Sequence, residues 1–258
     1  MIMGVVKRLL FRNVVPIIGR IMVGKNKYCN VIYYHDIVET EGETYMRTNI
    51  DVFRKQMDYL AREGYSTLRF DDLDNEEQLA FAKKRILIAF DDGWKSNYTA
   101  IFDYMKTKGL KYNVFLTIGE IGKNDDYLTW DQVREMHQSG IVGFGAHTYS
   151  HPDMSDFNKI DYDLEIVRAD SVFEKELGYK PLDFCYPFGY YSDAGNHILE
   201  ERSGYKRIYT SKMMYSYKEN GMVIMGRNGI NGDWPFGVFR SQVDGYFNVF
   251  KSLFLRKR

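Results

Sequence analysis

The chain has few cysteines, no net charge and no long apolar run. Its 258 residues include only two cysteines, Cys29 and Cys185, too few for a disulfide framework and compatible with a reducing cytosol. Basic and acidic residues number 35 each, so the formal net charge is zero. Apolar residues make up 45% and aromatic residues 16% of the chain, which indicates a globular protein and excludes a disordered one.

The zero net charge hides an uneven distribution. Residues 1–27 carry six basic and no acidic residues, and residues 245–258 carry four basic and no acidic ones. All 35 acidic residues therefore lie between these ends, with the remaining 25 basic ones. Such an acidic body argues against nucleic acid as a partner.

The N-terminal residues are apolar between their basic residues, but no run is long. The longest uncharged interior run, from Asn13 to Gly19, is too short to span a bilayer. Arg12 and Arg20 also leave no room for the apolar core of a secretory signal. The pattern favours a basic amphipathic segment lying on an anionic membrane, and residues 245–258 repeat it. Two terminal helices packed on the body, with solvated Lys and Arg, are the alternative.

Strand-like and helix-like patterns alternate about seven times, with no composition break that marks a second domain. Strands are expected at 31–35, 65–68, 85–90, 111–117, 141–145, 184–186, 207–211 and 222–225. Helices are expected at 50–63, 72–83, 98–108, 130–140, 161–177 and 193–202, with a last one within 236–255. This alternation predicts an α/β fold of parallel strands with helices outside, either a barrel or an open sheet.

Polar residues that could carry chemistry follow five of the predicted strands. They are His35, Asp91, Asp92, His147, His151 and the segment Pro187–Gly189. In a β/α barrel the active site is built from the carboxyl ends of the strands. We therefore expect these residues to meet at one mouth.

Two of these groups have the composition of a metal site. Two imidazoles, His147 and His151, and one carboxylate commonly hold a divalent transition metal while leaving positions open. Asp92 can bind the metal while Asp91 stays free as a base. No Glu follows His147, so the metalloprotease pattern His-Glu-x-x-His is absent. Turn-forming aspartates and hydrogen-bonded loop histidines are the alternative.

Three motifs in order along the chain carry a family resemblance: Ala89–Gly93 (AFDDG), His147–His151 (HTYSH) and Phe184–Gly189 (FCYPFG). With them, over roughly residues 30–230, the chain resembles the polysaccharide deacetylase superfamily, the NodB-homology or carbohydrate esterase family 4 group. The resemblance implies a single distorted (β/α)7 barrel and a metal-dependent amide hydrolase. It places the catalytic domain at 28–244, between a basic N-terminal segment (1–27) and a basic tail (245–258).

The resemblance also implies a role for each motif. The first Asp, Asp91, would be the general base. One divalent metal, Zn²⁺ in first place with Co²⁺, Ni²⁺, Fe²⁺ or Mn²⁺ as alternatives, would be bound by Asp92, His147 and His151. The groove that binds substrate and oxyanion would be lined by Tyr186, Pro187, Phe188 and Gly189. A backbone N–H at Phe188 would help to stabilise the oxyanion.

Two departures from the family pattern concern the catalytic groups. Where many members have an Arg that orients the catalytic Asp, this chain has Cys185. Arg227 is a candidate replacement, and an ordinary surface Arg is the alternative. The late Leu-x-His that supplies the general acid is missing, since no His follows His197.

His35 is the candidate for the missing acid. The early Tyr34–Ile37 stretch resembles a circularly permuted branch that deacetylates poly-N-acetylglucosamine, in which an early His is the acid. Imidazole is also the side chain that titrates near neutral pH. A purely structural His35 is the alternative.

The sequence therefore predicts a metal-dependent N-deacetylase whose partner is an N-acetylated carbohydrate. The expected substrate is an amino sugar in a bacterial surface polysaccharide or its lipid-linked precursor. We expect a cytoplasmic protein, peripheral at the inner face of the cell membrane through its basic ends. The alternatives are an O-acetyl esterase or small-amide deacylase using the same site, and a glycan-binding protein on a catalytically decayed barrel. The oligomeric state is not indicated.

Overall fold

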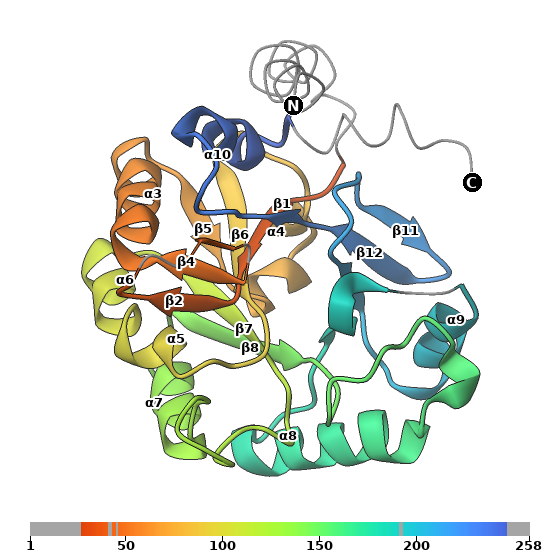
Figure 1. Ribbon diagram of the computed structural model, residues 1–258. Coiled ribbons are helices and arrows are strands. Elements are labelled where there is room, and N and C mark those ends of the chain that lie inside the picture. The colour runs from red at the N-terminus through yellow and green to blue at the C-terminus, as the bar shows by residue number, and fades with distance from the viewer. Residues whose placement is uncertain (1–26, 41–42, 45, 191–192, 247–258) are drawn as a thin grey trace, which may run out of the picture.

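The computed structural model describes residues 27–40, 43–44, 46–190 and 193–246 (Figure 1). The predicted membrane-binding segments, 1–27 and 245–258, lie almost entirely outside these residues. Within the described part of the chain, none of the helices is both long and apolar enough to span a membrane.

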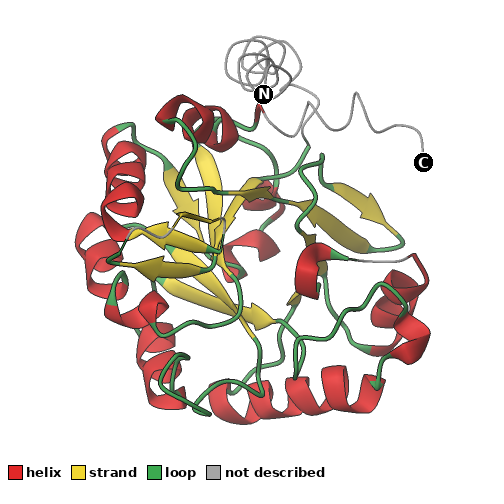
Figure 2. Cartoon of the chain, in the orientation of Figure 1, coloured by secondary structure: helices red, strands yellow, loops and turns green. Residues whose placement is uncertain are grey.

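A ten-stranded sheet forms the centre, and helices surround it (Figure 2). Its strands run in the order β11-β12-β10-β9-β8-β7-β6-β1-β13, with β5 paired to β6, and all pairs are parallel except β11 with β12. The strands are β1 Asn30–Tyr34, β5 Ser66–Leu68, β6 Arg85–Phe90, β7 Tyr112–Leu116, β8 Val142–Ala146, β9 Asp183–Cys185, β10 Arg207–Thr210, β11 Tyr217–Glu219, β12 Met222–Gly226 and β13 Asn228–Gly229. The predicted α/β class is confirmed.

The end of the last long strand brings the two edges of the sheet together. Strand β12 pairs with β10, and only Arg227 separates it from β13, which pairs with β1. The short stretch from 222 to 229 thus contributes β12 to one side of the sheet and β13 to the opposite edge. The sheet is strongly curled as a result, as expected for a distorted (β/α) barrel.

The helices lie outside the curled sheet, as Figure 1 shows for α3, α6, α7, α8 and α9. They are α3 Ile50–Arg62, α4 Glu76–Leu79, α5 Ser96–Thr99, α6 Phe102–Lys108, α7 Trp130–Gln138, α8 Ala169–Leu177, α9 Asp193–Arg202 and α10 Phe236–Val243. Local sequence explains their ends. The Asn49 side chain accepts hydrogen bonds from the first turn of α3, and Thr129 and Gln132 form a capping box on α7.

Three predicted helices are not continuous. The predicted acidic helix at 72–83 is wrong, because Asn75 caps a new start and leaves only the 3-10 turn Asp71–Asp74 and the short α4. The segment 98–108 divides into α5 and α6. The segment 161–177 begins with a π-helical stretch, η4 Asp163–Arg168, before α8.

A small sheet beside the mouth was not predicted. Strand β2 (Asp36–Val38) pairs with β4 (Arg47–Asn49), which pairs with β3 (Glu43–Thr44). These strands have two or three residues each, too few to give a period-2 pattern.

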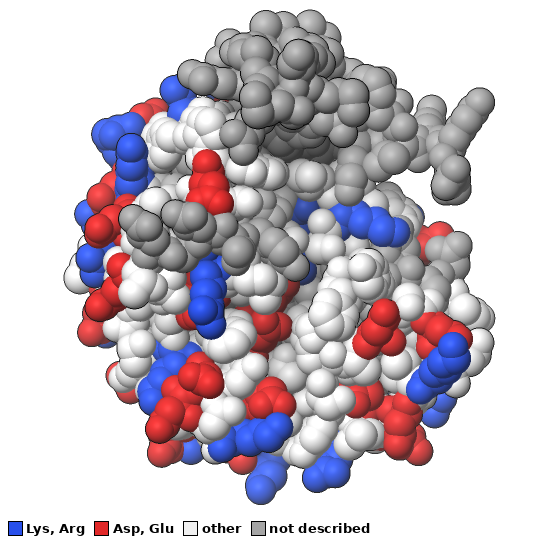
Figure 3. Space-filling view, in the orientation of Figure 1, with Lys and Arg blue, Asp and Glu red and all other residues white. Residues whose placement is uncertain are grey.

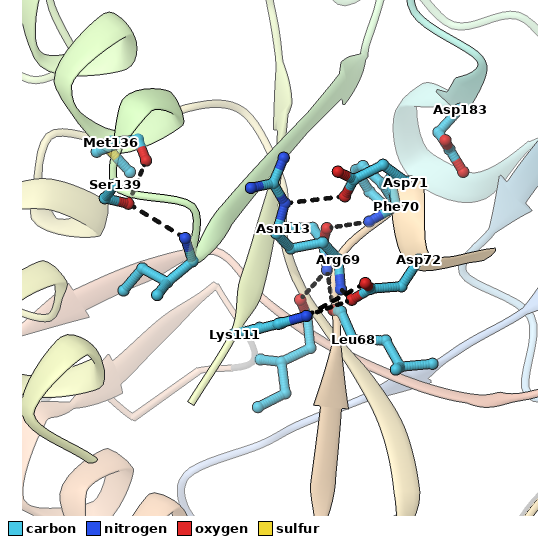
Figure 4. Close-up of polar contacts among 12 residues, drawn as sticks. Leu68, Arg69, Phe70, Asp71, Asp72, Lys111, Asn113, Met136, Ser139 and Asp183 are labelled. Carbon is cyan, nitrogen blue, oxygen red and sulfur yellow. Dashed lines mark hydrogen bonds and ion pairs between the residues drawn. The ribbon is translucent and has the colours of Figure 1, made fainter. Parts of the chain in front are cut away.

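A buried amide joins strands that the ladder leaves apart. β5 pairs with the first half of β6 and β7 with its end, so β5 and β7 are not ladder partners. The Asn113 amide donates to the carbonyls of Leu68 and Ile88, and its oxygen accepts from the Phe70 N–H at 2.8 Å (Figure 4). A Cβ on Gly143 would lie only 2.4 Å from that amide oxygen, which explains a glycine at this position.

Candidate active site and metal centre

The carboxyl ends of the parallel strands bring the predicted residues to one mouth. His35 follows β1, Asp91 and Asp92 follow β6, and His147 follows β8. Arg227 arrives from the end of β12, on the other side of β1 from Asp91. The Asp91 N–H donates to the Tyr34 carbonyl at 3.0 Å, which ties the ends of β6 and β1 together. Topology alone therefore assembles groups that are up to 192 residues apart in sequence.

Asp92, His147 and His151 form a compact cluster. The Oδ1 atom of Asp92 lies 3.4 Å from Nε2 of His147 and 3.4 Å from Nε2 of His151. The two imidazoles meet edge to face at 4.8 Å between ring centroids. His147 is almost fully buried, while His151 is partly exposed and faces the mouth. Three ligand atoms within 4.8 Å of one another are an arrangement that can hold a metal ion.

A hydrogen bond fixes which nitrogen of His147 faces the cluster. Its Nδ1 lies 2.7 Å from the Cys185 carbonyl, so Nδ1 carries the proton and Nε2 keeps its lone pair toward Asp92. This contact comes from β9, the neighbour of β8 in the sheet. An imidazole held in this way can act as a metal ligand.

Unusual backbone conformations concentrate at this mouth. Of the six non-glycine residues with positive φ in the described chain, four belong to the motifs: Asp92, Thr148, His151 and Phe188. Such conformations cost about 1–3 kcal/mol each and persist where the surrounding structure holds them. At Gly93, which has φ +83°, a Cβ would also meet Ile121 at 2.8 Å, so the turn after Asp92 requires glycine.

Asp91, the other aspartate of the motif, is paired with a buried arginine. Arg227 has no exposed surface, and its Nη1 and Nη2 donate to Oδ1 and Oδ2 of Asp91 at 2.6 and 2.8 Å. Its Nε donates to the Thr210 carbonyl, and its guanidinium lies 4.1 Å from the Tyr33 ring centroid. The alternative of an ordinary surface arginine is excluded. Position 185, where many family members have the arginine that orients the aspartate, is a cysteine in this chain. Arg227, between β12 and β13, makes that contact instead.

Arg227 also controls the charge of Asp91. Burial alone would raise the pKa of Asp91, but the charge of Arg227 and its two hydrogen bonds outweigh burial and lower that pKa. Asp91 is therefore a carboxylate at neutral pH. For Asp92, burial again opposes ionisation, and the nearby imidazoles of His147, His35 and His151 lower its pKa. Both aspartates are thus ionised.

His35 lies beside Asp91. Its Nε2 is 3.9 Å from Oδ2 of Asp91, and its ring meets the Tyr33 ring edge on at 5.6 Å. The Asn97 amide donates to the His35 carbonyl and fixes the backbone there. The candidate acid therefore lies next to the candidate base.

The third motif divides between the core and the mouth. Tyr186 is fully buried and donates its hydroxyl hydrogen to Asn196, so its side chain cannot line the groove as expected. Phe188 is 55% exposed and stands edge on to the His151 ring at 4.6 Å. Pro187 and Gly189 are buried in the turn between them. A substrate at the mouth can therefore meet this motif through Phe188 and the backbone of the turn.

Two residues that support the cluster were not predicted. Glu165 is a buried carboxylate on η4 that accepts hydrogen bonds from the N–H groups of Tyr149 and Ser150 and from the Ser150 hydroxyl. Trp94 donates its indole N–H to Asp92. The position of Trp94 directly after the Asp-Asp-Gly motif was a signal that could have been used, whereas nothing in the local sequence distinguishes Glu165 from a surface helix residue.

The remaining histidines lie elsewhere. His137 stacks on Tyr179 at 5.2 Å, and His197 is exposed beside Glu201 on α9. Among the described residues, the histidines at the mouth are therefore His35, His147 and His151.

The geometry and donor atoms of the cluster fit a divalent transition metal. Oδ1 of Asp92 is buried and has no hydrogen-bond partner, although a buried carboxylate oxygen normally requires one. It faces two imidazole nitrogens, one of which has its lone pair fixed in that direction. A carboxylate with two imidazoles is a donor set suited to Zn²⁺ and similar ions, with positions left for water and substrate.

The sequence matches a known family. A family model described as polysaccharide deacetylase matches residues 78–206. YxkH of Bacillus subtilis, which is named as a polysaccharide deacetylase, is 26% identical over 216 residues, covering 83% of this chain and 75% of YxkH. A peptidoglycan-N-acetylglucosamine deacetylase of Bacillus cereus is 27% identical over 167 residues, covering 62% of this chain and only 56% of that protein.

Solved structures share the fold. The Streptococcus pyogenes deacetylase PplD, solved with acetate, superposes with a TM-score of 0.71 at 23% identity, covering 84% of this chain and 99% of PplD. IcaB from Ammonifex degensii superposes with a TM-score of 0.70 at 22% identity, covering 84% of this chain and 97% of IcaB. At these identities the superpositions establish the distorted-barrel architecture.

Proposed function

The chain belongs to the polysaccharide deacetylase family, a family of hydrolases, and we propose that it removes N-acetyl groups from an amino sugar in a metal-dependent reaction. One observation carries the proposal. An ionised Asp91, held by Arg227, lies beside a cluster of Asp92, His147 and His151 at a single mouth. A pure binding protein needs no base next to such a cluster, so the decayed-barrel alternative is disfavoured.

Asp92, His147 and His151 would hold the metal. When bound there, a divalent ion would supply Lewis-acid polarisation of the acetyl carbonyl and would make water acidic enough to react near neutral pH. The protein supplies the fixed ligand geometry, through the buried His147 and its hydrogen bond to the Cys185 carbonyl.

The protein's own groups then perform the proton transfers. Asp91 accepts the proton of the attacking water, and its two hydrogen bonds to Arg227 keep it ionised and in place for this role. His35, 3.9 Å from Asp91, donates a proton to the leaving amine as the C–N bond breaks. The products are acetate and a free amino sugar. The backbone N–H of Phe188 helps to stabilise the oxyanion.

The nature of the substrate rests on the relatives. Proteins named as peptidoglycan-N-acetylglucosamine deacetylase, chitin deacetylase and poly-β-1,6-N-acetyl-D-glucosamine N-deacetylase all match this chain. Each name refers to a polymer that contains N-acetylglucosamine. This supports a bacterial surface polysaccharide or its lipid-linked precursor as the substrate. The exposed Phe188 ring beside His151 offers a face on which a sugar ring can pack.

An O-acetyl esterase is the second candidate, because the same base and cluster could attack an ester. Assays with matched N-acetyl and O-acetyl glucosamine substrates separate the two. We expect acetate release from the amide.

The first test is metal content. The wild type and His147→Ala, purified without chelator or metal-affinity resin, are compared by elemental analysis. We expect about one tightly held transition metal per chain in the wild type and loss of it in the variant. Asp91→Asn should keep the metal and lose turnover. A wild type that binds no metal even after addition of Zn²⁺, or an Asp91→Asn variant with near-normal rates, would overturn the proposal.

A further inference from the structure

The two oxygens of the Asp92 carboxylate have different surroundings. Oδ1 faces His147 and His151 at 3.4 Å each and has no hydrogen-bond partner. Oδ2 accepts a hydrogen bond from the indole Nε1 of Trp94 at 3.0 Å. Oδ1 is therefore directed at the proposed metal position, while Oδ2 already accepts a hydrogen bond.

Trp94 is itself held independently of Asp92. Its ring stacks on the Tyr127 ring, with centroids 4.8 Å apart and planes 20° from parallel. The backbones of the two residues form an antiparallel bridge, and the Leu128 N–H donates to the Gly93 carbonyl at 3.0 Å. The segment 126–128 thus sets the position of the indole, and the indole in turn restrains the carboxylate.

Such a restraint matters because the last torsion of an aspartate is soft. The χ2 angle of Asp has a broad, roughly two-fold distribution, so packing alone does not fix which oxygen points where. Asp92 also has φ 75°, an uncommon conformation that places its side chain at a sharp turn. Without the indole N–H, either oxygen or both could turn toward the imidazoles.

We propose that Trp94 is a positioning residue for the metal site: its indole N–H holds Oδ2 of Asp92, so that Oδ1 alone is presented between His147 and His151. The inference rests on the proposed function, because it concerns the same metal. It predicts that loss of one hydrogen bond, without loss of an aromatic ring, weakens metal binding. Hydrogen-bond partners of metal ligands typically contribute 10–100-fold to metal affinity.

The test compares Trp94→Phe with Trp234→Phe in the full-length chain. Phenylalanine keeps a ring for the stack on Tyr127 but has no N–H. Trp234, which lies between β13 and α10 and is 38% exposed, is the matched control because it belongs to none of the three motifs. Zinc affinity is measured by competition with a chromophoric chelator. We expect Trp94→Phe to bind Zn²⁺ about 10–100-fold more weakly and Trp234→Phe to match the wild type. At saturating Zn²⁺ the KM of Trp94→Phe should stay near the wild-type value, which a lost sugar contact would not allow.

A second measurement uses the folded wild type and so does not depend on the variant. The chain has three tryptophans, and their indole N–H signals can be resolved by NMR after ¹⁵N labelling and assigned through Trp130→Phe and Trp234→Phe. Addition of Zn²⁺ should shift the Trp94 signal far more than the other two, and His147→Ala should abolish the shift. A Trp94→Phe variant with wild-type zinc affinity, or a Trp94 signal that ignores Zn²⁺ bound by the wild type, would overturn the positioning role alone. If neither the wild type nor any variant binds Zn²⁺, the proposed function fails instead.

Discussion

At the residue scale, the pair of Arg227 and Asp91 has the largest consequence for chemistry. A buried carboxylate without a partner would be neutral and useless as a base at neutral pH. The bidentate guanidinium keeps it ionised and also fixes its plane. Arg227 lies between β12, which pairs with β10, and β13, which pairs with β1. The segment that orients the base is therefore also the one that connects the two sides of the curled sheet.

We predict that Arg227→Lys lowers kcat by on the order of 10²-fold while KM changes little. Lysine keeps the positive charge but cannot make two parallel hydrogen bonds, so Asp91 would remain ionised and lose its orientation. Steady-state kinetics on an N-acetylated substrate at saturating Zn²⁺ gives both constants.

Arg207 provides a matched control for that variant. It is also a buried arginine with a bidentate pair, to Asp183 at 2.6 and 2.8 Å, but it lies at the start of β10 and not at the mouth. Arg207→Lys should lower stability to a similar extent and leave kcat near the wild-type value. Equal losses of kcat in both variants would reduce Arg227 to a structural residue.

A second prediction concerns pH and stability, away from the active site. Burial raises the pKa of Asp170 to about 7, although its hydrogen bond from the Tyr205 hydroxyl, 2.7 Å, acts in the opposite direction. The folded pKa thus lies above the unfolded value of about 3.9. The native state then holds a proton that the unfolded state has lost, so stability is lost as the pH rises through 7.

Urea unfolding at pH 5 and pH 8 tests this for the wild type and Asp170→Asn. Between these pH values Asp170 alone should remove roughly 2 kcal/mol from the free energy of unfolding. Asparagine cannot ionise, so the variant should lose correspondingly less. If the two proteins show the same pH dependence, Asp170 is ionised in the folded state at pH 5.

At the scale of elements, the loop between His147 and His151 depends on η4. The Glu165 carboxylate accepts three hydrogen bonds from Tyr149 and Ser150 in that loop. A π-helical stretch adds a residue to a turn, and such stretches are frequent at functional sites. Here it places one carboxylate under the loop that carries both histidines.

We predict that Glu165→Gln weakens zinc binding and lowers stability by about 1–3 kcal/mol. Glutamine brings an NH₂ group against backbone and hydroxyl donors, so at least one of them loses its acceptor. Chelator competition and urea unfolding measure the two effects. Glu176→Gln is the control, because Glu176 pairs with Arg134 on α7, remote from the loop. Unchanged zinc affinity in Glu165→Gln would mean that the loop is held well enough without it.

Elements with strong local signals were predictable, and those defined by distant contacts were not. Helix α3 begins and ends where its Asn49 cap and Gly64 place it, and β6 matches its predicted range. The single helix predicted at 161–177 ignored η4, since apolar spacing does not distinguish a π-turn from an α-turn. The small sheet of β2, β3 and β4 depends on pairing between segments too short to signal themselves.

At the scale of the whole molecule, the site was predictable because parallel strands end at one mouth. That rule alone predicts that His35, Asp91, Asp92 and His147 lie together. It could not say that Arg227 would be buried, because Arg227 lies between β12 and β13 and not at the end of a predicted strand. Nor could it place Tyr186, which directly follows β9 and whose side chain is buried in the core.

The molecule's basic ends support a proposal about location. The drawn face shows Lys and Arg mixed with Asp and Glu, without a block of one sign among the described residues (Figure 3). Electrostatic attraction to anionic lipid would come mainly from residues 1–27 and 245–258, which hold ten basic and no acidic residues, because the rest of the chain has 25 basic against 35 acidic ones. Each basic residue near an anionic surface contributes about 1 kcal/mol.

We therefore predict that replacing Lys7, Arg8, Arg12 and Arg20 by Gln weakens binding to phosphatidylglycerol-containing vesicles by roughly 10³-fold. The control replaces four exposed lysines of the body by Gln: Lys55, Lys83, Lys123 and Lys175. Cosedimentation should show wild-type binding for this control and little binding of any protein to phosphatidylcholine alone. Binding of the wild type should also fall with added salt, because exposed charges are screened. Equal losses in the two quadruple variants would indicate general charge attraction, and the proposed attachment through the N-terminal segment would be wrong.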